Sequence, residues 1–166
     1  MADKPVTALD FLMDQHRQVE ELFDELEDAE SADERTEVCA LICDNLAIHA
    51  KIEESYFYPA VQAARTEDIL LESLEEHVQV KRAIVDLLAL SATDERFLAT
   101  ANVLKESVQH HVEEEEGDLF PKVRKLFNTD RLVAIAQEMM AKVVELEGTD
   151  ARKNVAKEIK AAAPLG

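Results

Sequence analysis

The sequence predicts an all-α protein, built as an up-down-up-down four-helix bundle with one or two additional C-terminal helices. The 166 residues include only 3 Gly and 4 Pro, and abundant residues such as Ala, Leu and Glu favour helices. Apolar side chains recur at helical spacing almost from end to end. The interruptions are short, so neighbouring long helices are expected to pack antiparallel around one core.

The first two long helices are expected over residues 6–29 and from residue 31 to about residue 64. The first has an apolar face, and the acidic residues on its other face are most simply a solvated surface. Ser31 and Glu34 form a capping-box signal at the start of the second helix. Pro59 predicts a kink near its end, because proline removes a helical hydrogen bond.

The third and fourth long helices are expected over residues 66–90 and 93–127, each with a Thr as its candidate N-cap. Gly117 and Pro121 are weak points in the fourth helix, because both residue types are unfavourable in a helix interior. The turn between these helices is short, which favours an antiparallel pair.

Two shorter helices are expected over residues 131–146 and from about residue 150 to residue 162. We therefore divide the chain into a bundle, residues 1–127, and a C-terminal helical extension, residues 128–166. No low-complexity linker separates them, so the extension is expected to pack on the bundle. Basic side chains in its last helix either complement the acidic bundle or bind a protein partner. They are Arg152, Lys153, Lys157 and Lys160.

The composition excludes several partners. The formal net charge of −18 repels phosphate and argues against nucleic acid or an anionic membrane surface. No stretch approaches the ~20 apolar residues of a membrane span, and the N-terminus lacks an apolar signal core, so we expect a cytoplasmic protein. Cys39 and Cys43 are interpreted as small core residues, because a disulfide within one helical turn would be strained.

A repeated motif points to a metal site. His49 and Glu53 recur 62 residues later as His111 and Glu115, and each pair is followed by an aromatic or large apolar residue and a Pro. Residues four apart lie on one face of a helix, one turn from each other. Each copy therefore presents an imidazole and a carboxylate to the same place, as expected for a metal site between two facing helices.

The repeat extends to the other two long helices, where His16 and His77 stand 61 residues apart within apolar stripes. Burying imidazoles and carboxylates without partners would cost several kcal/mol, and first-row metals suit these ligands. The alternative is a set of hydrogen-bonded core histidines with two buried ion pairs. Because the two copies of the repeat supply matching histidines and glutamates, we predict two ions bridged by the two carboxylates. The candidate ligands are His16, His49, Glu53, His77, His111 and Glu115.

Four neighbouring residues need a separate assignment. His110 stands beside His111, but the repeat alignment favours His111 as the inward residue. Tyr56 falls on the metal-facing stripe of an ideal helix, and Asp118 is its partner in the repeat. Either side chain would hydrogen-bond near the metals or fill a vacant coordination position. Tyr58 is expected on the opposite face, unless Pro59 bends the helix.

The order His, His-x-x-x-Glu, His, His-x-x-x-Glu, with a Pro after each pair, resembles the hemerythrin-like, or HHE cation-binding, family over about residues 8–127. The resemblance implies a four-helix bundle that holds two iron ions, bridged by the carboxylates and by an oxygen species. It also implies small oxygen or nitrogen species as partners, since family members bind O2, respond to oxygen, nitric oxide or peroxide, or handle iron.

The chain departs from the oxygen-carrying members of that family. Their third helix has His-x-x-x-His, whereas here Ser73 and Lys81 stand one turn before and after His77. Their fourth helix has His-x-x-x-x-Asp, whereas this chain has His-x-x-x-Glu. Ser73 and Lys81 join Tyr56 as candidates near the vacant position. These differences favour reaction with peroxide, O2 or nitric oxide over reversible O2 carriage.

Two classes of function stay open after the sequence analysis. One is weak redox activity toward peroxide or nitric oxide at a di-iron centre, and the other is a non-catalytic iron buffer or a metal-dependent sensor. A ferritin-like oxidase is rejected because no histidine follows a Glu by three residues. A zinc protease is excluded by the absence of His-Glu-x-x-His.

Overall fold

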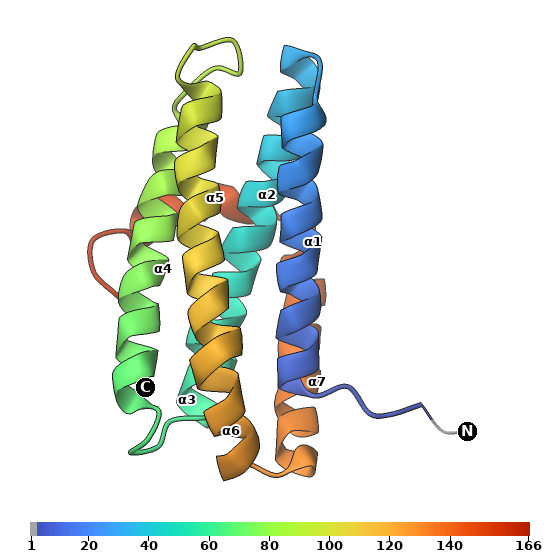
Figure 1. Cartoon of the computed structure of the whole chain (residues 1–166), viewed down its shortest axis with the longest axis vertical. Coiled ribbons are helices and arrows are strands. Elements are labelled where there is room, and N and C mark those ends of the chain that lie inside the picture. The colour runs from blue at the N-terminus through green and yellow to red at the C-terminus, as the bar shows by residue number, and fades with distance from the viewer. Residues whose placement is uncertain (1–2) are drawn as a thin grey trace.

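Four long antiparallel helices form the body of the protein in the computed structural model, which describes residues 3–166 (Figure 1). They are α1 (Ala8–Asp28), α2 (Ala32–Ile52), α4 (Glu67–Leu88) and α5 (Phe97–Glu114). The described residues contain no strand, so the predicted all-α fold is confirmed. Within the same residues, no helix combines the length and the apolar character needed to cross a membrane.

The first helix begins with the hydrogen-bond pattern of a complete capping box. The Asp10 N–H donates to the Thr7 hydroxyl at 3.2 Å, and the Thr7 N–H donates to the Asp10 carboxylate at 3.0 Å. The fourth long helix, in contrast, begins at Phe97 instead of near Thr93. Thr93 is instead part of a turn, in which its N–H donates to the Ser91 hydroxyl at 3.3 Å.

Removing the Thr7 side chain, which caps α1, is expected to reduce the stability of the protein modestly. Thr7→Ala is expected to lower the free energy of unfolding by about 1 kcal/mol, because an N–H in the first turn of α1 loses its acceptor. The melting temperature should fall by about 2–4 °C. Thr7→Ser keeps a hydroxyl and should stay close to the parent protein in thermal denaturation. Equal losses in both variants would contradict the capping role.

Both helices that carry the His-x-x-x-Glu motif continue through a π-helical turn. Tyr58 donates its N–H to the Glu53 carbonyl, and Phe120 donates its N–H to the Glu115 carbonyl. These bonds span five residues instead of four, and a proline follows each of them directly. The turns cover Glu53–Phe57 and Glu115–Leu119, and they lead into α3 (Tyr58–Ala60) and α6 (Phe120–Leu126).

The π-helical turns change which residues face the bundle interior. A π-helical turn inserts one extra residue, so residues beyond it are rotated by roughly 100° relative to an ideal α-helix. The weak points predicted at Pro59, Gly117 and Pro121 therefore take the form of a shift in helical register.

The core consists of two apolar clusters, one toward each end of the bundle. Phe23, Leu104 and both cysteines belong to the first cluster, and the two cysteines are buried free thiols, as predicted. Leu9 and Phe120 belong to the second cluster. Along α1, the inward residues before His16 join the second cluster and those after it join the first. The histidines therefore occupy a polar layer between two apolar ones.

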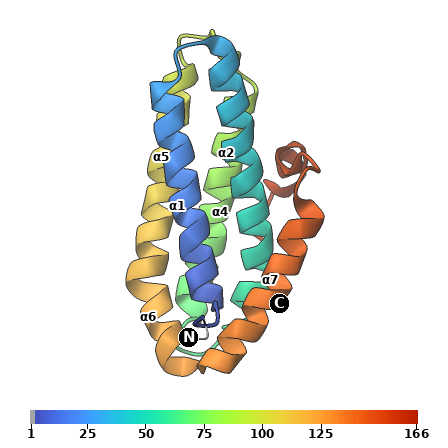
Figure 2. The same ribbon diagram turned by 90° about the vertical axis from the view of Figure 1, so that its right-hand side faces the viewer.

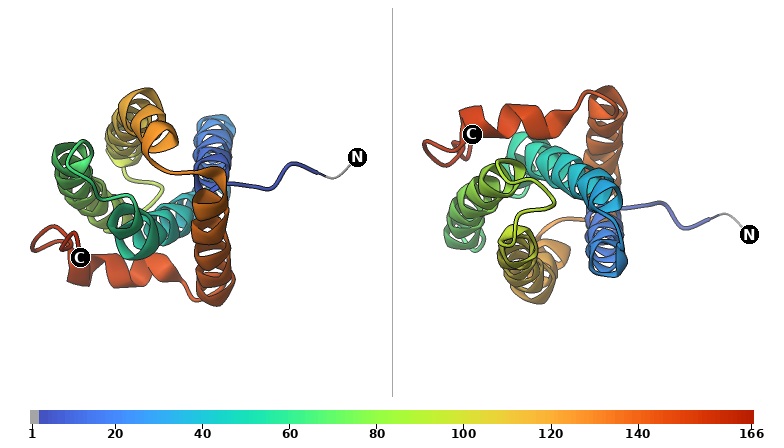
Figure 3. Two further views of the ribbon diagram at one scale, coloured as in Figure 1. Left: turned by 90° about the horizontal axis from the view of Figure 1, so that it is seen from below. Right: turned by 90° about the horizontal axis from the view of Figure 1, so that it is seen from above.

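The C-terminal part of the chain packs on the outside of the bundle. Helix α7 (Thr129–Leu146) runs back along the bundle from its lower end (Figure 2) and buries Ile135 and Met139 in the second cluster. The final segment, Ala151–Glu158, is a 3-10 helix that lies across α2 and α4 (Figure 3). Val155 buries its side chain in the first cluster, and Arg152 pairs with Asp44 of α2 at 2.8 Å.

Candidate metal centre

The structure brings all six predicted ligand residues into the polar layer. Each long helix contributes one histidine, and the two glutamates are the first residues of the two π-helical turns. All six are buried, with at most 9% of any residue exposed. They are His16, His49, Glu53, His77, His111 and Glu115.

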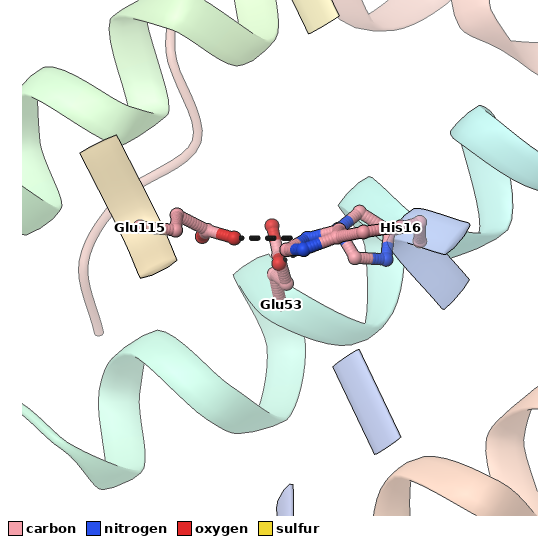
Figure 4. Close-up of side chains that lie close together, drawn as sticks. His16, Glu53 and Glu115 are labelled. Atoms are coloured by element: carbon pink, nitrogen blue, oxygen red, sulfur yellow. Dashed lines mark ion pairs between the residues drawn. The ribbon is translucent and has the colours of Figure 1, made fainter. Parts of the chain in front are cut away.

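One half of the layer contains His16 and His49. The His16 Nε2 lies 3.2 Å from Glu115 Oε2, and the His49 Nε2 lies 2.8 Å from Glu53 Oε1. Figure 4 shows Glu115 and His16 reaching toward each other across the bundle, with Glu53 between them. These four residues are close enough to surround a single cation.

The other half contains His77 and His111, and it uses the second oxygen of each carboxylate. The His77 Nε2 lies 2.9 Å from Glu53 Oε2, and the His111 Nε2 lies 3.4 Å from Glu115 Oε1. Glu53 and Glu115 therefore each direct one oxygen toward the His16/His49 pair and the other oxygen toward the His77/His111 pair. This is the arrangement expected of carboxylates that bridge two cations.

A tyrosine also reaches this centre, but it is not the predicted one. The Tyr58 hydroxyl lies within hydrogen-bond distance of both carboxylates, 2.6 Å from Glu115 and 2.9 Å from Glu53, and it lies 3.2 Å from the His77 Nε2. Tyr56 is half-buried against the second apolar cluster and makes no hydrogen bond to a candidate ligand among the described residues, so the hydroxyl at the centre belongs to Tyr58 and not to Tyr56 as predicted. The π-helical turn is the physical reason, because it rotates Tyr58 toward the centre.

Several buried polar atoms of the centre form no aligned hydrogen bond among the described residues, although the imidazole nitrogens and carboxylate oxygens lie close together. Both ring nitrogens of His16, the Nε2 of His49, Oε1 of Glu53 and Oε2 of Glu115 are in this state. Unpaired buried polar atoms are costly and rare in proteins. These atoms belong to nitrogen and oxygen ligands that suit iron and other first-row metals, so the residues fit a metal centre.

The electrostatics of the centre are those of a strongly coupled cluster. Burial opposes charge on the carboxyls, but His49 and its neighbours hold the pKa of Glu53 well below its usual range, and the pKa of Glu115 falls to about 2. Burial also opposes charge on His111, yet Glu115 raises its pKa well above the ordinary value. Burial and both carboxylates raise the pKa of Tyr58. Metal binding is therefore expected to displace protons from the imidazoles.

Three outer residues that the sequence analysis missed hold the histidine rings in place. Gln15 Oε1 lies 2.7 Å from the Nδ1 of His49, and Glu76 Oε2 lies 2.6 Å from the Nδ1 of His111. Glu54 has an 8% exposed side chain and contacts the Nδ1 of His77 at 2.9 Å. These acceptors keep the proton on Nδ1 and leave Nε2 free for a metal.

Two of these outer residues, Gln15 and Glu76, occupy equivalent positions of the 61-residue repeat. Each of them stands one residue before a candidate histidine. Each side chain contacts the histidine of a neighbouring helix, so the match was visible in the sequence, but its meaning needed the packing of helix against helix.

The remaining predicted neighbours lie outside the ligand cluster. Lys81 is buried and pairs with Glu54 at 2.7 Å, whereas Ser73 is buried without a hydrogen bond to a candidate ligand in the described residues. Asp118 is on the surface and pairs with Lys122, so its predicted role near the metals is corrected. His110 is 65% exposed, which agrees with the choice of His111 as the inward residue.

A small cavity adjoins the centre on the side of the first apolar cluster. Its volume of about 30 Å³ is enough for one or two water-sized molecules. Gln15 and Asn45 line it together with all four candidate histidines, and the remainder of its wall is mainly valine, leucine and alanine. The cavity therefore offers a small, mostly apolar space next to the potential ligands.

Comparison with known proteins supports this description. The family model for the hemerythrin HHE cation binding domain matches residues 7–123. A solved structure of a hemerythrin HHE cation binding domain-containing protein from Mycobacterium kansasii has a TM-score of 0.78. It is 24% identical, and the match covers 95% of this chain and 97% of that one, so it shows the same fold.

One curated relative is a protein from Nostoc sp. (strain PCC 7120) that bears the name DNA nickase. It is 29% identical over 126 residues, which are 76% of this chain and 36% of the relative. The chain therefore spans little more than a third of that relative's length.

Proposed function

Because the chain belongs to the hemerythrin HHE cation-binding family, we propose that it is a non-haem di-iron protein that binds or reacts with O2, peroxide or nitric oxide. One observation carries the proposal: Glu53 and Glu115 each direct one oxygen toward one pair of histidines and the second oxygen toward the other pair. Two carboxylates in this position favour a pair of cations over a single one.

The proposal gives each residue of the centre a role. His16 and His49 would hold one iron ion, His77 and His111 would hold the other, and the two glutamates would bridge them. Tyr58 would serve as an additional oxygen ligand, or as a hydrogen-bond donor to the carboxylates. When bound, such a pair of ions would supply one-electron redox chemistry and a position for a small oxygen or nitrogen species.

The protein's own side chains would control access and protons. The cavity beside the histidines is large enough for a diatomic molecule or peroxide, and its valine and leucine wall limits water. The Tyr58 hydroxyl is buried and bonded to both carboxylates, so it holds a proton at the centre. The DNA nickase activity named for the Nostoc relative is not proposed for this chain, because its net charge of −18 repels a phosphate backbone.

A second candidate is a metal-dependent sensor or a non-catalytic iron buffer. A chain of contacts favours the sensor: His77 contacts Glu54, Glu54 pairs with Lys81, and Lys81 pairs with Glu158 of the C-terminal segment at 3.2 Å. Metal binding at His77 would thus reach the surface through three side chains.

Iron loading tests the proposal. The protein is loaded anaerobically with Fe(II), its bound iron is counted, and its absorption is recorded before and after oxidation. Two irons per chain and an oxo-bridge charge-transfer band are expected. Fewer than two irons and no such band would overturn the di-iron proposal.

Peroxide consumption then separates redox activity from buffering or sensing. The iron-loaded protein is expected to consume peroxide faster than His49→Ala, because the variant lacks one candidate ligand. Equal consumption by both proteins would favour the buffer or the sensor.

A further inference from the structure

The two halves of the metal centre differ in the residues that support their histidines. Gln15 and Glu76 occupy equivalent positions of the repeat and contact equivalent histidines, at 2.7 Å from His49 and 2.6 Å from His111. One acceptor is a neutral amide and the other is a carboxylate. Gln15 and Glu76 therefore occupy equivalent positions in the two copies of the repeat, but only Glu76 carries a charge.

The second pair of outer residues differs in the same direction. Glu54 and Glu116 are equivalent in the repeat, and Glu54 contacts the Nδ1 of His77 at 2.9 Å. Glu116 lies 3.4 Å from the Nδ1 of His16, and that nitrogen has no hydrogen-bond partner within residues 3–166. Glu116 is instead engaged by the guanidinium of Arg17.

A third difference lies beyond the π-helical turns. Tyr58 and Phe120 are equivalent in the repeat, and both are fully buried. Tyr58 places its hydroxyl between the carboxylates next to His77 and His111. Phe120 offers no oxygen and stacks on the ring of His16 instead, with the ring centroids 6.1 Å apart.

These differences have the same chemical effect. A carboxylate that accepts the Nδ1 proton makes the imidazole a stronger ligand than an amide does, and it adds negative charge near the cation. An additional phenol oxygen strengthens the same side. The half with His77 and His111 has all three advantages, whereas the half with His16 and His49 has only the Glu116 carboxylate, which does not hydrogen-bond to the Nδ1 of His16.

We propose that the centre consists of two unequal metal subsites, that the subsite of His77 and His111 binds a divalent metal first and more tightly, and that the Gln15/Glu76 pair is a main determinant of the difference. Glu76 and Gln15 act through the histidines and are positioning residues. The inference rests on the proposed function, because it requires that the centre binds two ions.

Zinc titration of the metal-free protein against a chromophoric chelator tests the inference. The parent protein is expected to bind two Zn²⁺ with dissociation constants at least about tenfold apart. Glu76→Gln should weaken the tighter site by about 10-fold or more. Gln15→Glu should strengthen the weaker site, so that the two constants approach each other.

Glu75→Gln is the matched control for Glu76→Gln. Glu75 is the exposed neighbour of Glu76 on α4, and the described contacts do not join it to a candidate ligand. This variant should leave both zinc constants within about twofold of the parent values, since substituted outer residues act through ligands that they contact.

The outcomes separate the inference from the proposed function. The inference would be overturned if the parent protein bound two zinc ions with equal dissociation constants. It would also be overturned if neither Glu76→Gln nor Gln15→Glu changed these constants. Both results would leave a two-metal centre intact. Fewer than two zinc ions per parent chain would contradict the two-metal centre itself. Gln15→Glu keeps the test decisive if Glu76→Gln fails to fold, because the two substitutions act on different helices.

Discussion

Tyr58→Phe is expected to weaken the binding of one of the two metal ions by about 100-fold, the upper range for residues that support a metal site. The phenol oxygen lies among Glu53, Glu115 and two candidate histidines, and within residues 3–166 no other tyrosine hydrogen-bonds to the centre. The phenyl ring that replaces it keeps the packing but offers no oxygen. Competition with a chromophoric chelator measures the affinity.

Tyr56→Phe is the matched control for this prediction. It removes the same hydroxyl from a residue two positions earlier that packs against the second apolar cluster. Its metal affinity should stay within about twofold of the parent, because nothing at the centre changes. If Tyr58→Phe behaved like the control, the hydroxyl would have no role in holding metal.

Lys81→Met is expected to lower the free energy of unfolding of the metal-free protein by about 3 kcal/mol. The Lys81 side chain is 5% exposed and lies 2.7 Å from Glu54 and 3.2 Å from Glu158. Methionine has a similar length but leaves the buried Glu54 carboxylate without its cation. A fall of about 6–12 °C in the melting temperature is expected at this chain length.

Lys122→Met provides the comparison, because Lys122 pairs with Asp118 on the surface, where both side chains are at least 40% exposed. Such pairs contribute at most about 0.5 kcal/mol. Chemical denaturation of both variants, with a chelator present, gives the two free energies. A loss in Lys81→Met no larger than that in Lys122→Met would show that the buried lysine does not stabilise the fold.

The helices and the six central residues were predictable because they depend on local, periodic rules. Apolar spacing located the four long helices, and the spacing of His49 and Glu53 placed their side chains on one face. The helix limits were less predictable. The fourth helix begins at Phe97 and not near Thr93, because Thr93 belongs to the turn that follows Ser91. The last predicted α-helix is a 3-10 helix, stabilised by tertiary contacts such as Arg152 with Asp44.

The sequence by itself determined that this is a helical bundle with one inward histidine on each long helix and two glutamates in matched positions. Only the tertiary structure decided that Tyr58 rather than Tyr56 faces the centre, because a π-helical turn rotates the residues that follow it. It also decided that Gln15 and Glu76 support different histidines, since these contacts join helices that are distant in the sequence. Helical periodicity describes one helix at a time, whereas the chemistry of this centre depends on how four helices meet.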